Sequence, residues 1–562
     1  MSELSLDQAL EAADLRVLLM VLFQMTGDRR WLDAPYRPKR DVSLIADEAA
    51  GFAPDIQAEI KAAARLVLAA DKPPAISDPG DELMVEMMRF CLSEDVPPEY
   101  APMMREQIGL IKPEAPKSIR DPDARPVVIA GAGASGIALG KKLGDLGIAY
   151  LIVERNDEVG GTWYENKYPG CSVDTPNHAY SFSFGSGYPW SRNFSPRAEI
   201  QDYLERSATE FGVRANIRFG VELSSATWDE AALCWRLTLS TATGEEQLEA
   251  RAVVSAIGQL SQVSMPTIKG ADNFTGGLFH TARWPDDLDL TGKRVAIIGT
   301  GASAMQIVPE IADQVASLTI YQRSAQWARP IPRFHDGISD GGQWLLKNIP
   351  LYAAWYRFAM LWRYGDGLLP SLHIDPDWPH PERSLNRAND RHRIEMTAYL
   401  TGELEGRPDL IEKCLPDYPP YGKRILLDNN WFKTLCRPNV DLITEGIGHL
   451  DQAGIETENG IHRAADVVIY STGFKLTEMA ARLNITGRQG LKLKDLWADQ
   501  NPTAYYGISV PEFPNLFITQ GPNTGLGHGG SAIFTGECQA HYIANCLARM
   551  SDDKIAAIDV RQ

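Results

Sequence analysis

The chain has 562 residues, of which 44% are hydrophobic and 23% are charged, as in an ordinary globular protein. A chain of this length is too long for one core and predicts roughly three or four domains. The net charge of −18 argues against nucleic acids and acidic membranes as partners, because both require basic surfaces. The seven cysteines include no C-x-x-C pair, which excludes a dithiol redox centre, indicates no zinc or other metal site and favours a reducing compartment.

Residues 1–112 are predicted to be helical and carry no glycine-rich loop. Ser5 and Gln8 form a capping-box pattern that predicts the start of the helix carrying residues 15–25. Further helices are expected near 55–70, 82–91 and 99–110. The 17–25 run is apolar nearly all round and must be buried on at least one face, yet it is too short to cross a bilayer. Two interpretations stay open, a helical bundle with its own core or a dimerisation platform.

A proline-rich linker at 113–126 leads into a first nucleotide-binding pattern. A buried strand is followed by Gly131, Gly133 and Gly136 in the GxGxxG spacing, then a helix, a second strand and Glu154. Gly131 permits the tight turn, Gly133 lets the backbone approach a diphosphate and Gly136 lets the helix pack on the strand. Glu154 is placed to accept hydrogen bonds from ribose hydroxyls. The complete pattern predicts a dinucleotide-binding fold.

A second nucleotide loop follows the apolar run 294–298, with Gly299, Gly301 and Ser303 in the loop and alanine at its last position, which the fingerprint allows. Its second strand leads to Arg323. An acid there would bind the 2′-hydroxyl of NAD, whereas an arginine pairs with a 2′-phosphate and therefore predicts NADPH. The alternative is that Arg323 is an ordinary surface charge.

The region from 335 to 420 interrupts the strand–helix rhythm. An aromatic stripe at helical spacing is either core or a cover that lines a substrate pocket over the nicotinamide domain. Beyond it, apolar runs at 466–470 and 515–518 are predicted to be strands of the first nucleotide-binding domain, followed by a helix at 532–550. The stripe consists of Tyr352, Trp355, Tyr356, Ala359 and Trp362.

Residues 125–550 resemble the type I Baeyer–Villiger flavoprotein monooxygenases. The pattern GGxWxxxxYPGxxxD fills 160–174, FxGxxxHxxxWP fills 274–285, and Gly422-Lys423-Arg424 with Asp428 is similar to a third family string. The resemblance implies an α/β fold with two Rossmann-like dinucleotide-binding domains, a helical insertion and an N-terminal all-helical extension. It also implies the cofactors FAD and NADPH, with O2 and a small ketone as substrates.

The same resemblance gives roles to individual residues. Thr162, Trp163, Asp174 and Tyr180 would lie against the flavin, while Lys423 would join Arg323 at the 2′-phosphate. Arg424 would be the active-site arginine, held by Asp174 and stabilising the anions that form when a C4a-peroxyflavin attacks a ketone to give an ester or lactone. His280 would belong to an interdomain linker and is expected to be structural rather than an acid or base.

The expected domains are the helical extension at 1–112, a flavin-binding part at 127–265, an NADPH-binding part at 266–464 with its insertion near 335–420, and a second flavin-binding part at 465–562. The extension resembles that of 4-hydroxyacetophenone monooxygenase, which implies a homodimer and favours an aryl ketone. Two other functions stay open: a flavin-containing N- or S-monooxygenase, and a nucleotide-binding redox sensor without turnover. A cytoplasmic protein without an integral membrane segment is expected.

Overall fold

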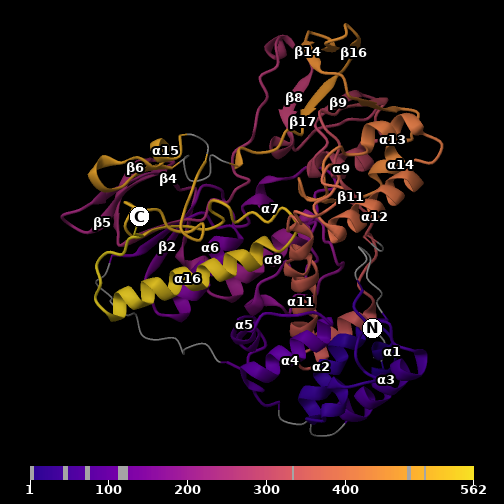
Figure 1. Cartoon of the computed structure of the whole chain (residues 1–562). Helices are drawn as coiled ribbons and strands as arrows, with labels where there is room; N and C mark the ends of the chain where they lie inside the picture. The colour runs from indigo at the N-terminus through magenta and orange to yellow at the C-terminus, as the bar shows by residue number, and fades with distance from the viewer. Residues whose placement is uncertain are drawn as a thin grey trace.

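The computed structural model describes residues 5–41, 49–69, 76–111, 125–331, 334–476, 483–498 and 501–561. Three lobes are visible in Figure 1, one of N-terminal helices and two that each surround a five-stranded parallel sheet. The predicted linker at 113–126 lies outside the described residues except for its last two positions. The mixed α/β architecture with two nucleotide-binding sheets agrees with the predicted fold class.

The first sheet has the strand order β19-β7-β1-β2-β3. Strands β1 and β7 are buried along their whole length, because helices cover one face of the sheet and the strands of residues 222–250 pack on the other. Strands β2 and β7 lie on opposite sides of β1, so the connections from β1 diverge and a crevice forms at its carboxyl end. Ligands bind at this position in α/β sheets. The strands are β1 (Val127–Ala130), β2 (Tyr150–Glu154), β3 (Ile217–Phe219), β7 (Ala252–Ser255) and β19 (Leu516–Ile518).

Helices cover one face of this first sheet, and the long C-terminal helix packs along the helix that follows the first glycine loop. Gly536 of the C-terminal helix lies against Ser135, where a Cβ would come within 2.9 Å of the Ser135 hydroxyl, so the two helices approach closely. A four-stranded sheet of order β18-β4-β5-β6 extends the same lobe (Figure 1). These elements are α6 (Ala134–Asp145), α7 (Thr162–Glu165), α8 (Arg197–Glu210), α16 (Ala532–Asp552), α15 (Leu493–Leu496), β4 (Glu222–Asp229), β5 (Cys234–Thr241), β6 (Gly244–Ala250) and β18 (Asn484–Thr486).

The second sheet has the order β13-β10-β9-β17-β8 and carries the second glycine loop after β9. A three-stranded sheet and a two-stranded parallel pair complete this lobe. The elements are β8 (Gly277–His280), β9 (Arg294–Ile298), β10 (Ser317–Tyr321), β13 (Val440–Ile443), β17 (Val467–Tyr470), β14 (Ile447–Leu450), β15 (Gly454–Thr457), β16 (His462–Ala464), β11 (Ala328–Arg329), β12 (Leu426–Leu427), α9 (Ala302–Ile311), α12 (Arg387–Glu403), α13 (Pro408–Cys414) and α14 (Trp431–Leu435).

Strand β17 corrects one expectation. The 466–470 run is expected in the returning flavin-binding part, but Ile469 pairs with Ile297 of β9 and with Phe279 of β8 in the second sheet. The chain therefore crosses back to the first sheet only after β17. An apolar run predicts a buried strand but carries no information about which sheet receives it.

The N-terminal helices form a bundle whose core is continuous with part of the insertion. The Ser5–Gln8 capping box opens the short α1, whereas Asp14 separately caps α2, so the expectation of one helix from that box is wrong. Helix α2 is buried on nearly every face, as its apolar run predicts. The helices are α1 (Leu6–Leu10), α2 (Leu15–Thr26), α3 (Pro54–Leu68), α4 (Gly80–Leu92) and α5 (Tyr100–Gln107).

Helices α10 (Asp340–Asn348) and α11 (Tyr352–Arg363) of the insertion dock onto this bundle, and α11 rises from it towards the other lobes in Figure 1. Trp355 donates to Gln24 at 2.6 Å, and the Tyr352 hydroxyl accepts from the Asp14 backbone at 2.8 Å. The aromatic stripe is therefore core between α11 and the N-terminal helices. Within the described ranges, no helix combines the length and apolarity that a membrane span requires.

Candidate active site

The first glycine loop is shaped by two close backbone approaches. Gly131 has φ +107°, and a Cβ there would lie 2.7 Å from the Ala256 carbonyl oxygen. A Cβ on Gly136 would lie 2.1 Å from the Gly131 oxygen, so the helix can approach the turn only with glycine at this position. Gly133 faces Gly161, and a Cβ on Gly133 would come no closer than 3.7 Å to it. The loop leaves its amide groups open towards a ligand.

Glu154 lies at the end of β2, beside this loop. Its carboxylate accepts hydrogen bonds from the Ala132 amide at 2.7 Å and from the Asn156 amide at 2.9 Å. Burial raises the pKa of Glu154, and the two amides oppose that shift. A carboxylate has about four acceptor positions, so it can still receive ribose hydroxyls.

The GGxW segment folds back over the loop as helix α7. Trp163 donates through its indole nitrogen to the Tyr180 hydroxyl at 3.0 Å, and the two rings meet edge to face with centroids 5.8 Å apart. Burial raises the pKa of Tyr180 to about 12, so the phenol stays neutral. The two rings form an aromatic wall of a large cavity.

A cavity of about 740 Å³ runs between the two nucleotide loops. This volume is within the range of natural cofactor sites. A Cβ on Gly301 would meet no atom within 4 Å, so that side of the cavity is open to a ligand. Ten of the predicted residues line the cavity: Gly131, Gly133, Glu154, Thr162, Trp163, Asp174, Tyr180, Gly301, Ser303 and Arg424.

The remaining predicted residues do not line this cavity. Gly136 and Gly299 act through backbone packing, since a Cβ on Gly299 would lie 2.3 Å from the Ser471 oxygen. Arg323 and Lys423 are both exposed and lie together beyond the end of β10. Lys423 donates to Ser324 at 2.6 Å, and burial followed by the nearby charge of Arg323 lowers its pKa. Two exposed cations therefore lie side by side at this strand end.

Arg424 and Asp174 form a bidentate ion pair that joins the two nucleotide-binding lobes. The Arg424 Nε donates to Oδ2 at 2.7 Å and Nη2 donates to Oδ1 at 2.9 Å, with side chains 38% and 29% exposed. Burial alone would raise the pKa of Asp174, but the charge and hydrogen bonds of Arg424 outweigh it, so the pKa is lowered. The charge of Asp174 raises the pKa of Arg424. Both groups are ionised at neutral pH.

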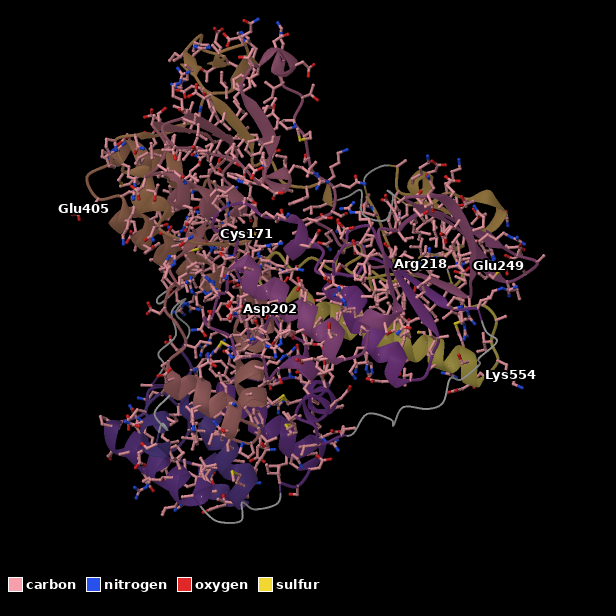
Figure 2. The ribbon with its side chains drawn as sticks, turned by 180° about the vertical axis from the view of Figure 1, so that it is seen from behind. Cys171, Asp202, Arg218, Glu249, Glu405 and Lys554 are labelled. Atoms are coloured by element: carbon pink, nitrogen blue, oxygen red, sulfur yellow. The ribbon has the colours of Figure 1, made fainter. Side chains whose placement is uncertain are left out.

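The segment between Tyr168 and Asp174 docks onto α9 of the second lobe. The Tyr168 hydroxyl donates to Gln306 Oε1 at 3.0 Å, and Gln306 Nε2 donates to the Ser172 carbonyl at 3.0 Å. A Cβ on Gly170 would lie 2.5 Å from the Gln306 oxygen. Cys171 of this segment lies near the centre of the molecule in Figure 2. Gln306 was not predicted, and no local motif marks it.

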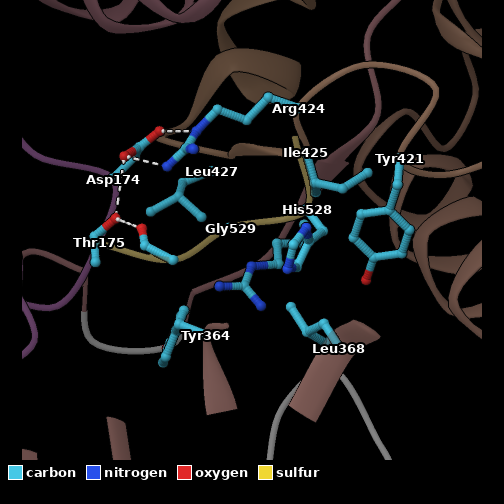
Figure 3. A pocket seen from close by; sticks show the side chains of 12 residues that line it. Asp174, Thr175, Tyr364, Leu368, Tyr421, Arg424, Ile425, Leu427, His528 and Gly529 are labelled. Carbon is cyan, nitrogen blue, oxygen red and sulfur yellow. Dashed lines mark hydrogen bonds and ion pairs between the residues drawn. The ribbon is translucent and has the colours of Figure 1, made fainter. Parts of the chain in front are cut away.

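A second, smaller cavity of about 20 Å³ adjoins the first at the Arg424–Asp174 pair. Figure 3 shows Tyr364 and Leu368 on the side of the cavity opposite that pair. His528 lies near the middle of the same view, with Tyr421 to its right. Thr175 donates to the Gly530 carbonyl at 3.2 Å and closes one edge. Arg329, Tyr364 and His528 were not predicted as site residues.

His280, the histidine of the FxGxxxHxxxWP string, ends β8 and is buried. Its Nδ1 accepts from the Ala282 amide at 3.1 Å, and its ring meets Phe474 edge to face at 5.8 Å. Burial lowers its pKa, so the imidazole is neutral at pH 7. It lines neither cavity. The geometry agrees with the expected structural part in the connection between lobes.

Comparison with known proteins adds independent evidence. A family model described as pyridine nucleotide-disulphide oxidoreductase matches residues 128–339, which span both glycine loops, although all seven cysteines are free. The chain is 40% identical over 559 residues to an uncharacterized monooxygenase, y4iD, from Sinorhizobium fredii, covering 99% of this chain and 84% of that protein. It is 37% identical over 438 residues to a Baeyer-Villiger monooxygenase of Pseudomonas aeruginosa, covering 77% and 79%. The chain belongs to the type I Baeyer–Villiger monooxygenases.

A solved structure of the OTEMO complex with FAD and NADP superposes with a TM-score of 0.68 and 29% identity, covering 80% of this chain and 88% of that one. As a member of this family, the present chain uses FAD and NADPH. Its large cavity, with the glycine loops and Glu154, fits such cofactors. The resemblance to y4iD includes the N-terminal helices, because it extends over 559 residues.

Proposed function

We propose that the Arg424–Asp174 pair is the catalytic centre at which this monooxygenase inserts one oxygen atom next to a ketone carbonyl. The main observation behind this proposal is that the bidentate pair lies at the junction of the two cavities. FAD, when bound, supplies the activation of O2, using electrons from NADPH. Thr162, Trp163, Asp174 and Tyr180 would line its site, and the first glycine loop with Glu154 would bind its diphosphate and ribose.

Arg424 can serve two purposes at once because a guanidinium has five N–H groups. Three of them point to Asp174 and to the Leu526 carbonyl, the last at 3.3 Å. The other two can donate to an oxygen that becomes negatively charged as the ketone reacts. A cation that keeps its proton is suited to that charge, and its value is greatest in a site shielded from water.

Asp174 is a positioning residue in this proposal. Its two oxygens fix the guanidinium plane, and its lowered pKa keeps it an anion, so it is not a proton donor at neutral pH. Arg323 and Lys423 would bind the 2′-phosphate of NADPH, with Ser303 and the second glycine loop holding the diphosphate. This arrangement accounts for two exposed cations placed side by side.

An N- or S-monooxygenase forms no negatively charged carbonyl adduct and therefore would not need the Arg424 guanidinium. A redox sensor without turnover would need no second cavity for a substrate. The test uses the FAD-loaded protein, NADPH and labelled O2 with aryl, cyclic and linear ketones, and reads the products by mass spectrometry. Esters or lactones with one labelled oxygen support the proposal. Peroxide as the only product from every ketone, with turnover of amines or sulfides, would overturn it.

We also propose a homodimer and an aryl ketone substrate, because the N-terminal extension resembles that of the 4-hydroxyacetophenone monooxygenase subgroup. The core of the N-terminal helices is shared with α10 and α11 of the same chain, so a dimer would form through the outer faces of this lobe. Light scattering of the full-length protein tests the dimer. A monomer at micromolar concentration would contradict it.

A further inference from the structure

Arg329 is a cation held in place beside the catalytic pair. The strand β11 that carries it pairs in parallel with β12, so Arg329 lies next to Leu427, three residues beyond Arg424. The Asp428 amide donates to the Arg329 carbonyl at 2.9 Å, and the Arg329 guanidinium carbon lies 4.7 Å from the centroid of the Tyr364 ring. Backbone pairing and ring stacking therefore fix this side chain without using its N–H groups.

Within the described ranges, the Arg329 guanidinium has no carboxylate of its own, although its charge helps to lower the pKa of Asp174. Among the described residues, no hydrogen bond or ion pair reaches its side chain, although it lines the small cavity. The one carboxylate in the lining, Asp174, is already engaged on both oxygens by Arg424. The lining therefore carries two guanidinium charges against one carboxylate. An excess positive charge in a confined site favours an anionic ligand.

His528 adds a polar group to the same lining. Its Nε2 is buried without a hydrogen-bond partner. Burial is the main cause that lowers its pKa, with Asp366 opposing and Arg424 assisting, so the ring is neutral at pH 7. Asp366 does not line the cavity. A neutral imidazole can donate one hydrogen bond to an acceptor in the cavity.

The size and position of the cavity restrict the group that it can hold. A volume of about 20 Å³ has room for one or two water molecules. It can therefore receive the two oxygens of a carboxylate but no ring. Asp174, Thr175, Arg424, Gly529 and Gly530 line both cavities, so the two share a wall at the catalytic pair. A molecule whose carbonyl lies at Arg424 can extend its other end towards Arg329.

We infer that the substrates of this enzyme are ketones that carry a carboxylate, and that Arg329, assisted by His528, binds that carboxylate while the carbonyl lies at Arg424. This inference rests on the proposed function. It makes Arg329 a specificity-determining residue that is not needed for oxygen activation. Neutral ketones of the same skeleton are poorer substrates because they leave the Arg329 charge without a partner.

The test compares 5-oxohexanoate with 5-oxohexanamide, which has the same shape and no charge, and 3-oxocyclohexanecarboxylate with its amide. For the FAD-loaded wild type we expect kcat/KM, measured from the esters or lactones formed, to favour each carboxylate at least about tenfold, the range of a charge-assisted hydrogen bond. Arg329→Met should remove the preference, and Arg329→Lys should keep part of it because it keeps the charge but not the planar fork.

The matched control is Arg407→Gln, which removes an arginine of the insertion that lines neither cavity and pairs with Asp409 at 2.8 Å. It should keep the wild-type preference. NADPH oxidation without ketone should be the same in all variants, which shows that they fold and bind FAD. Equal kcat/KM for carboxylate and amide in the wild type, or an unchanged preference in Arg329→Met, overturns the inference and leaves ketone oxygenation standing. Failure to oxygenate any ketone overturns the proposed function instead.

Discussion

Arg357 of α11 donates a hydrogen bond to Glu537 of α16 at 3.1 Å, and the two side chains are only 3% and 8% exposed. Arg357 also donates to Gln107 of α5 at 2.8 Å and to the Ser181 carbonyl at 2.9 Å. Glu537 accepts in addition from the Ser183 hydroxyl at 2.7 Å. The N-terminal bundle, the insertion and the first nucleotide-binding lobe thus meet in one buried polar network.

Glu537→Gln is expected to destabilise the protein by about 3 kcal/mol, because removing one partner of a buried ion pair leaves the other charge uncompensated. Thermal unfolding, followed by circular dichroism and flavin fluorescence, measures the effect. The double variant Arg357→Met with Glu537→Gln should recover part of the loss, since no unpaired charge remains. A Glu537→Gln protein as stable as wild type would show that the network does not hold the lobes together.

The two glycine loops predict opposite outcomes for the same substitution. Gly136→Ala places its Cβ 2.1 Å from the Gly131 oxygen, whereas a Cβ on Gly301 meets no protein atom within 4 Å. We expect Gly136→Ala to lose FAD and to unfold at a lower temperature than wild type. We expect Gly301→Ala to fold with FAD bound but to bind NADPH more weakly. Absorbance of the purified proteins and NADPH titration separate the two. A Gly136→Ala protein with full FAD content contradicts the packing argument.

Arg323→Ala and Lys423→Ala are each expected to raise KM for NADPH about tenfold and to leave KM for NADH nearly unchanged, because they remove charge-assisted hydrogen bonds to the 2′-phosphate at an exposed site. The ratio of kcat/KM for the two cofactors is the measurement. Lys433→Ala, at an exposed lysine of the same lobe whose side chain is 65% exposed, should leave the ratio as in wild type. Equal losses with NADPH and NADH would contradict a 2′-phosphate site.

The lowered pKa of Asp174 fixes the sign of a pH effect. Its unfolded-state pKa is about 3.9, and the folded-state pKa is lower, so the pair stabilises the fold above that value and loses its effect as pH falls through the folded-state pKa. The difference in melting temperature between wild type and Asp174→Asn should stay constant from pH 8 to about pH 5 and shrink in stronger acid. A difference that grows on acidification would contradict the assignment.

Much of the nucleotide-binding fold could be predicted because buried parallel strands are continuous apolar runs next to glycine loops, as in β1 and β9. Strand β17 was placed in the wrong sheet because its residues fit either one, and only pairing with Ile297 and Phe279 decides. The aromatic stripe of α11 predicted a buried face, but helical spacing does not identify the N-terminal helices as the surface that covers it. Sequence periodicity reports burial and not the partner.

Arg424 and Asp174 were predicted because each belongs to a string with fixed neighbours. Arg329, His528 and Tyr364 were missed because each stands alone in the sequence and the site forms only when β11 pairs with β12 and the 528–530 turn closes over Tyr364. Gln306 was missed for the same reason. Contacts between lobes leave no local pattern.

The most direct test of the account is the amount of ester formed per NADPH consumed by Arg424→Ala, compared with Arg424→Lys and wild type, with FAD content and flavin reduction measured on the same samples. We predict that Arg424→Ala keeps FAD and still oxidises NADPH, but forms ester at least about a hundredfold more slowly, the loss typical of a missing oxyanion donor. Arg424→Lys should retain little more, since it cannot form the bidentate pair with Asp174. Ester formation by Arg424→Ala at the wild-type rate would contradict the central claim.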